Sequence, residues 1–383
     1  MSIQLLRESR LFVSTVESGF SKDNTMEILI QDDLDFGVSG NFTDIQVNEA
    51  GPVPVRGTRR YNDSLNPGEW SFSTYILPYK DKTSGKMMVP DYMLWHALVS
   101  GKPVDVNGTD GFHTNETNAL VDFKTSAFHE LRTLHIFVRV GEVWYKIRKT
   151  QVNQAEISVD IENIATVSWS GNGTEITVLE AAPFKFEDVS VITDELYHQL
   201  QESYLVNKLT IMHVTDNTGT KKDYSVPITG ATFTVNNNIT YLTPNTLSRI
   251  DRPIGSFTGA ISITGSLTAY LNTNPLGTAE LYKDLLDNLS SVNSYTVSFV
   301  LGGEYDDPKP VAVIAIPQAN LSIPSLEIDD VLSTQIEFSA QPTEMDAGDQ
   351  AFFAFSSEFD KAKIAKVIKD GDAHTAVDPG VGG

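Results

Sequence analysis

The chain of 383 residues contains no cysteine and no apolar run long enough to cross a membrane. Disulfide bonds and thiolate metal sites are therefore excluded, and packed cores must hold the fold together. A membrane-spanning helix needs about 18 or more consecutive apolar residues, and no stretch approaches that length. The first residues carry no long apolar segment either, so no signal peptide is expected.

Positive charge is scarce. Lys and Arg total 28 against 50 Asp and Glu, which gives a formal net charge of −22 and a pI of about 4.6. This balance argues against tight binding to nucleic acid, because phosphate contacts need Lys and Arg to displace counterions. Such a chain is suited to repel a polyanion. Solubility alone is the other explanation of the charge, and the composition leaves both open.

Catalytic and metal-binding motifs are also missing. The chain has no H-E-x-x-H, no G-x-S-x-G elbow, no P-loop and no G-x-G-x-x-G. Acidic pairs such as Asp306 and Asp307 are expected on the loops of so acidic a chain and do not by themselves make an acid–base site. We therefore expect no enzyme activity, no cofactor and no metal site. The seven histidines follow no ligand spacing: His96, His113, His129, His135, His198, His213 and His374.

The most informative feature that is present is a repeat. Gln154–Val159 returns as Gln318–Ile323, and Val167–Gly171 returns as Ile336–Ala340. These segments alternate apolar and polar residues, which is the period of a β-strand with one face on a core. A strand pair that recurs in a chain of this length predicts a duplicated module.

Further matched segments precede this pair in the same order. Phe36–Val38 matches Phe233–Val235, and Gly68–Ser73 matches Gly259–Thr264. An apolar, helix-compatible run follows in each half. Its apolar positions are Tyr92, Leu94, Trp95 and Leu98 in the first half and Leu281, Tyr282, Leu285, Leu286 and Leu289 in the second.

Each half is therefore predicted to contain strands, one helix with Asp91 or Thr278 as its N-cap, and more strands. The predicted fold class is mainly β with short helices, in two tandem β-sandwich or barrel modules that each pack one helix. The first module is assigned to residues 1–180 and the second to residues 207–343. The remaining segments are a linker at 181–206 with a helix at Asp194–Leu205, and a partly disordered extension at 344–383 with a helix at Glu358–Lys369.

Two proline-bearing segments, residues 38–62 and Leu242–Pro253, lie at matched places and are predicted to reach out as arms. One interpretation is that they contact an acidic surface on a neighbouring subunit. The other is that they are solvated loops, and the sequence does not choose between them. Their arginines are Arg56, Arg59, Arg60, Arg249 and Arg252.

The end of the second half resembles a known family. Asn320–Pro324 leads into Leu326–Val331 and then Gln335–Pro342. These segments, and the order of strands, arm, helix and strands, are similar to the tail tube proteins of tailed bacteriophages, of the T5-like kind in which two tube modules are fused. The resemblance covers about residues 8–342. An immunoglobulin-like domain, which some relatives carry, is not recognisable at 344–383.

The resemblance implies a structural virion protein, assembled in the host cytoplasm, whose modules form rings of six around a lumen. With two modules in each chain, three chains would close a ring, and stacked rings would form the channel for DNA ejection. The implied partners are further copies of the chain, the tape measure, tail terminator and baseplate or tip proteins, and viral DNA that passes without tight binding. No membrane partner is implied.

A polar strand face could line such a lumen or cover the outside, and the alternation of residues does not choose between the two. The lumen is favoured by the tube resemblance and the negative charge. The candidate lumen residues are Glu156, Ser158, Asp160, Glu162, Glu337, Ser71, Ser73, Ser262, Thr264 and Ser266.

A second hypothesis is a tandem β-sandwich that binds carbohydrate, as in a virion adhesin. Such a module would present an exposed aromatic platform. The four tryptophans, Trp70, Trp95, Trp144 and Trp169, all fall where a core or a helix can bury them.

Overall fold

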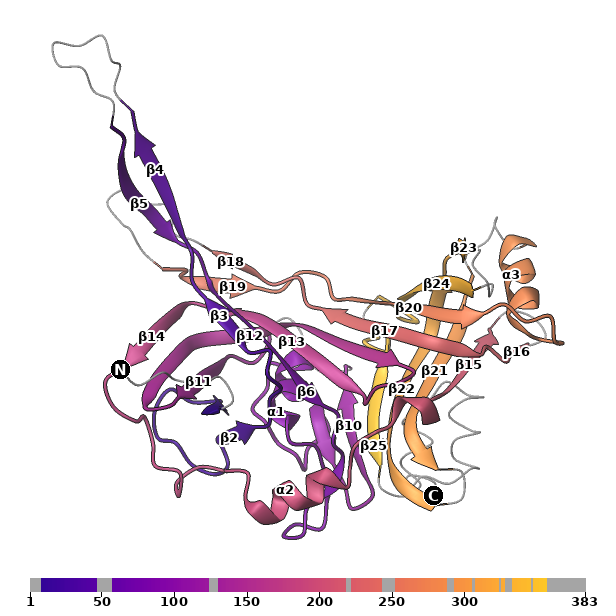
Figure 1. The fold of residues 1–383 in the computed structure, drawn as a ribbon, viewed down its shortest axis with the longest axis horizontal. Coiled ribbons are helices and arrows are strands. Elements are labelled where there is room, and N and C mark those ends of the chain that lie inside the picture. The colour runs from indigo at the N-terminus through magenta and orange to yellow at the C-terminus, as the bar shows by residue number, and fades with distance from the viewer. Residues whose placement is uncertain are drawn as a thin grey trace.

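The computed structural model describes residues 8–46, 57–123, 130–217, 222–242, 252–287, 293–304, 307–323, 325–327, 333–345 and 347–356. Over these residues the chain is mostly β-strand, with three short α-helices, so the predicted fold class is confirmed (Figure 1). Among these described residues, the strands pair antiparallel, and one isolated parallel bridge joins Met26 and Ser190. The four tryptophans are buried, so none of them offers an exposed platform.

The first half of the chain contains eight strands that recur in the second. They are β1 (Ser9–Ser14), β2 (Thr25–Ile28), β3 (Asp35–Gly37), β6 (Gly68–Tyr75), β11 (Leu134–Val140), β12 (Val143–Asp160), β13 (Thr166–Gly173) and β14 (Glu175–Leu179). Strand β1 pairs with β2 and β11, and β11 pairs with β12. Strand β12 pairs with β13 and β14, and β6 pairs with β13 and β3.

The second half repeats these pairings with its own strands. They are β15 (Ile211–Asp216), β16 (Asp223–Tyr224), β17 (Ile228–Asn236), β20 (Ser262–Tyr270), β21 (Tyr295–Glu304), β22 (Asp307–Leu321), β24 (Ser333–Ala340) and β25 (Phe352–Ser356). Strand β15 pairs with β16 and β21, and β21 with β22. Strand β22 pairs with β24 and β25, and β20 with β24 and β17. The repeated sequence segments therefore occupy corresponding strands.

One sheet crosses from the first half into the second. Strand β12 of the first half pairs along Gln154–Asp160 with β17 of the second half. The resulting order is β3-β6-β13-β12-β17-β20-β24, and β23 (Ser325–Glu327) and the end of β22 follow on the far side of β24. This shared sheet runs along the upper margin of the molecule (Figure 1).

A second connection between the halves lies on the opposite side of the core. It begins with the hairpin of β9 (Gly111–Thr114) and β10 (Asn118–Asp122), which the sequence analysis did not identify. Strand β10 pairs with β25, which itself pairs with β22. Residues 352–356 of the predicted extension are therefore part of the sheet. The helix expected at Glu358–Lys369 and the expected disorder of the last ten residues lie outside the described residues.

The two equivalent helices differ in how they are covered. Helix α1 (Tyr92–Val99) is buried at every residue after Tyr92. Helix α3 (Thr278–Asp287) buries Thr278, Leu281 and Leu285 and leaves its other faces at least partly exposed. It lies at the extreme right of the molecule in Figure 1, whereas α1 is enclosed between the sheets.

The acid that precedes α1 is buried inside this core. Asp91 is 2% exposed, and it accepts hydrogen bonds from Thr74 Oγ1 at 2.8 Å and from Trp95 Nε1 at 3.2 Å. Thr74 Oγ1 in turn accepts from Trp169 Nε1 at 2.9 Å. Burial raises the pKa of Asp91 to about 6, although these hydrogen bonds favour the charged form. The network links β6, β13 and α1.

Replacing this acid is expected to change the pH dependence of stability. Because the folded pKa lies above the ordinary value, Asp91 stabilises the fold most at acidic pH, and this contribution is lost as pH rises through about 6. The variant Asp91→Asn should lose this decline, which amounts to a change on the order of 3 kcal/mol between pH 4 and 7. Denaturant unfolding at several pH values measures it. Asp287→Asn, at an exposed acid of α3, should keep the wild-type profile.

The predicted linker packs against the first half of the chain. Its helix α2 spans Asp194–Gln201, shorter than predicted, and Thr193 caps it by accepting from Leu196 N at 3.2 Å. Phe184 and Val189 pack into an aromatic cluster with Phe12 on β1. Gln199 Nε2 reaches a carbonyl of the small hairpin formed by β7 (Tyr79–Lys80) and β8 (Met87–Met88). The division at residues 181–206 stays a prediction, because the sheets join the two halves into one body.

Candidate functional site

The polar faces of the shared sheet lie on one side. Across six strands, Ser73, Ser168, Glu156, Thr234, Thr264 and Ser339 form one register row. A neighbouring row carries Thr166, Ser158, Thr232, Ser266 and Glu337, and another carries Asp35, Ser71, Ser170, Gln154, Asn236 and Ser262. Because side chains alternate between faces, these residues all point away from the core.

The opposite face of the same strands is the core. Ile157, Phe233, Ile263 and Ile336 are each at most 3% exposed. A one-residue slip in any strand would exchange the two faces, so the buried side chains hold the polar face in register. We infer that the alternation seen in the sequence is enforced by packing.

This face is polar and acidic. Its six strands, β6, β13, β12 from Gln154, β17, β20 and β24, are all described and place no Lys or Arg on it. Asp35, Glu156, Asp160 and Glu337 supply negative charge. Hydroxyl pairs bridge neighbouring strands at 2.9 Å, between Ser73 and Ser168 and between Thr232 and Ser266.

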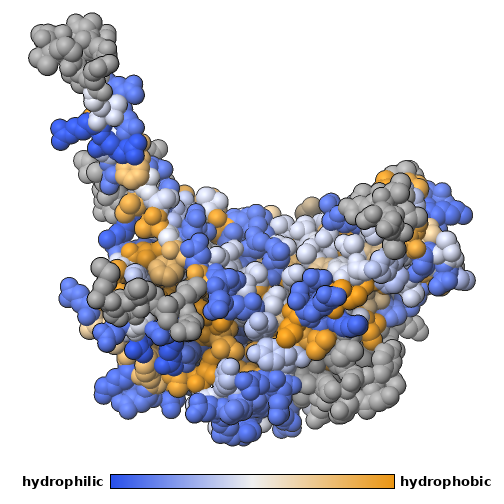
Figure 2. Space-filling model, viewed as in Figure 1, coloured by the Kyte–Doolittle hydropathy of each residue, from blue (hydrophilic) through white to orange (hydrophobic). Residues whose placement is uncertain are grey.

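The upper margin of the molecule is concave along this sheet. Figure 2 shows the hollow between the projecting arm and the α3 end, with mostly blue and pale atoms. Apolar atoms gather below it instead. A concave surface of this chemistry can face water and a passing polyanion without binding the polyanion tightly, because the surface presents no Lys or Arg to phosphate groups.

Nine of the ten candidate lumen residues share this face. The exception is Glu162, which lies in the turn after β12. Ser73 points the same way but is buried, and its backbone N–H donates to Asp33 Oδ1 at 3.0 Å. The same alternation, followed along β3, β12, β13, β17, β20 and β24, would also have found the residues of this face that the candidate set missed. They are Asp35, Gln154, Thr166, Ser168, Ser170, Thr232, Thr234, Asn236, Thr268, Gln335 and Ser339.

The first arm is a two-stranded hairpin of β4 (Gly40–Ile45) and β5 (Arg59–Leu65) that projects from the body (Figure 1). Arg60 forms a bidentate pair with Asp44 across the hairpin, at 2.7 and 3.0 Å. This pairing raises the pKa of Arg60 and lowers the pKa of Asp44. Arg59 is exposed.

The second arm lies against the first half of its own chain. Its strands are β18 (Thr240–Leu242) and β19 (Gly255–Phe257). Tyr241 donates its hydroxyl to the Asn172 carbonyl at 2.5 Å, and Ser256 donates to Gln151 Oε1 at 2.5 Å. Arg252 pairs with Glu175 of β14 at 2.5 Å. Arg56 and Arg249 lie outside the described residues.

In the described part of the chain, no group of three or more His, Asp or Glu side chains could hold a metal ion. No described helix has the length and apolar character needed to span a membrane.

Residues 88–340, more than half of the chain, match the family described as phage tail tube protein. The chain is 55% identical over 375 residues to the tail tube protein pb6 of Escherichia phage T5, an alignment that covers 98% of this chain and 80% of that protein.

Proposed function

Because the chain belongs to the phage tail tube protein family, we propose that it polymerises as stacked rings of three chains around a channel for DNA. It is a structural component of a virion tail, and the carbohydrate-binding alternative is not favoured. The observation that carries the proposal is the shared sheet. It joins two equivalent halves through β12 and β17 and ends in edges that a further copy can extend.

The ends of this sheet complement each other. Strand β3 corresponds to β17. The end of β22, which pairs with β24, corresponds to the end of β12, which pairs with β13. The junction between β12 and β17 inside the chain therefore gives the pattern for a junction between β22 of one chain and β3 of the next. Head-to-tail contacts of this kind close into a ring when the rotation permits. A ring also removes sheet edges that invite aggregation.

The polar face would then line the lumen. Duplex DNA carries one charge per about 1.7 Å of its axis, and a basic channel would hold it at many points. The phosphates are instead repelled by Asp35, Glu156, Asp160 and Glu337. The hydroxyl groups of the Ser and Thr rows hold a layer of water on the lumen surface. DNA would pass without tight binding.

The arms would join neighbouring copies. The second arm docks on the first half of its own chain, and both arms extend to the same side of their modules (Figure 1). By correspondence, the first arm would reach a neighbouring chain in the same or an adjacent ring. Its exposed Phe42, Ile45 and Tyr61 supply apolar contact, and Arg59 supplies charge.

In the virion, the tube would meet tape measure, tail terminator and baseplate or tip proteins, after assembly in the host cytoplasm. The proposal assigns the chain no enzymatic role. Microscopy of the purified chain tests it, since the expected result is rings or tubes with a central channel. A monomer that forms neither at any concentration would contradict the proposal.

A further inference from the structure

We propose that helix α3 of one chain packs into the open end of the first-half sandwich of a second copy, between its β3 and β14. This inference rests on the proposed ring. It names a second contact between neighbouring chains of that ring, outside the shared sheet. Its basis is a contact that the structure already contains between the two halves of one chain.

That contact is made by α1, the counterpart of α3. The ring of Trp95 lies 5.2 Å from that of Phe353 and 5.6 Å from that of Phe355, both on β25 of the second half. Phe353 in turn lies 5.1 Å from Phe233 on β17. Helix α1 of the first half thus closes the end of the second-half sandwich, between β17 and β25.

In the described part of the chain, no element covers the corresponding end of the first half. There, β3 corresponds to β17 and β14 corresponds to β25. The ring of Phe36 on β3 lies 5.2 Å from the ring of Tyr145, and Ile176 of β14 is only partly buried. Val178 of β14, which shares the face of Ile176, is 64% exposed. Among the described residues, only β12 pairs with β14.

An uncovered edge strand of this kind can pair with other chains and cause aggregation. The sequence of β14, Glu-Ile-Thr-Val-Leu, is rich in β-forming apolar residues and contains neither Lys nor Pro. Natural proteins protect such edges with charge, proline or a covering element. In the second half, the equivalent edge of β25 is protected by β10.

Helix α3 offers a matching apolar face. Leu281 and Leu285 point into their own core, and Lys222 holds Asp284 at 2.5 Å on another face. Tyr282 and Leu286, four residues apart, remain as an outward apolar pair, and Leu286 is 37% exposed. Aligning Leu281 and Leu285 with Leu94 and Leu98 of α1 places Tyr282 at the position of Trp95, the residue that makes the contact inside the chain.

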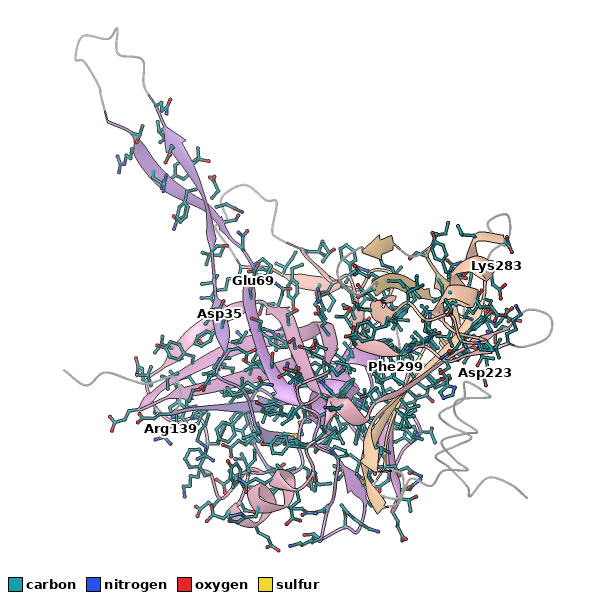
Figure 3. The ribbon with its side chains drawn as sticks, turned by 45° about the vertical axis from the view of Figure 1, so that its right-hand side comes forward. Asp35, Glu69, Arg139, Asp223, Lys283 and Phe299 are labelled. Atoms are coloured by element: carbon teal, nitrogen blue, oxygen red, sulfur yellow. The ribbon has the colours of Figure 1, made fainter. Side chains whose placement is uncertain are left out.

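The two surfaces lie at opposite ends of the molecule. In Figure 1, α3 is at the right and β14 at the left, and in Figure 3 Lys283 of α3 and Asp35 of β3 remain far apart after the rotation. One chain cannot join them to each other. A second copy related by a head-to-tail rotation can, so we assign this contact to a further copy of the chain.

Cross-linking tests the contact directly, because the natural chain contains no cysteine. The variant Val178→Cys, Leu286→Cys is assembled and treated with a short bismaleimide. The expected result on a denaturing gel is a ladder that ends at three linked chains. The control variant Tyr197→Cys, Leu286→Cys replaces the β14 position with an exposed site on α2 and should give only background.

A mixing experiment covers the case in which the double variant does not assemble. Chains with Val178→Cys alone and Leu286→Cys alone are each left unlinked by the reagent, and their mixture should give pairs and nothing larger. Rings or tubes whose linkage does not exceed the control would overturn the α3 contact and leave the proposed function standing. Failure of the wild-type chain to form rings would count against the proposed function itself.

Discussion

Tails built from a chain with Glu156, Asp160, Glu162 and Glu337 all changed to Lys are expected to eject DNA slowly, and the rate should recover as salt is raised. Three of these residues lie on the polar face of the shared sheet and the fourth is in the turn beside it. Their side chains are outside the core, so the tube should still assemble. Each new phosphate contact steepens the salt dependence of DNA binding, by about 0.9 in the slope of log K against log salt. Ejection kinetics over a salt series measures the effect.

The matched control carries the same change of charge elsewhere. Glu187, Asp188, Asp194 and Glu202 are exposed residues of the segment around α2, away from the shared sheet and from β14. Changing all four to Lys should leave ejection close to the wild-type rate. If the lumen variant ejects DNA normally at low salt, its four positions do not line the channel.

Gly265→Ala is expected to be one of the most destabilising small changes in the chain. A Cβ atom at Gly265 would lie 2.2 Å from the Thr232 carbonyl oxygen and 2.3 Å from Cζ of Phe338. The carbonyl belongs to the neighbouring strand and cannot rotate away, so β17 and β20 must separate. Overpacking of this kind costs about 1–3 kcal/mol. Denaturant midpoints of the unassembled chain, together with tube yield, measure the effect.

Gly230→Ala supplies the comparison. Gly230 lies on β17 in the same sheet, and the nearest atom to its added Cβ is the Val159 carbonyl oxygen at 3.5 Å, an ordinary contact. Its midpoint should stay near that of the wild type. Equal midpoints for the two variants would show that the space around Gly265 adjusts and that the shared sheet is not tightly packed there.

Local patterns in the sequence were enough to identify most of the repeated strands and their polar face. The period-two alternation of Ile157 and Val159 against Glu156 and Ser158 reports burial, because only one face of each strand meets the core. The repeat pointed to matching strands, since equivalent packing needs similar residues. Nine of the ten candidate lumen residues accordingly lie on one face.

Contacts between distant segments could not be read in the same way. Any two alternating strands can pair, so nothing local to β12 or β17 specifies their junction, and nothing in Phe352–Ser356 shows that it lies between β10 and β22. The hairpin at residues 111–122 was missed because its strands are short and follow a polar segment that contains Gly101, Pro103 and Gly108. The network around Asp91 was also hidden, since a candidate N-cap is usually exposed.

The central claim, that two fused modules build a ring of six positions from three chains, is tested most directly by the mass of a single ring. Native mass spectrometry of rings released from the tube should give three times the chain mass of 42.1 kDa. Averaged end-on images of the same material should look six-fold at low resolution. Six chains in each ring would contradict the account, because each chain would then supply only one position.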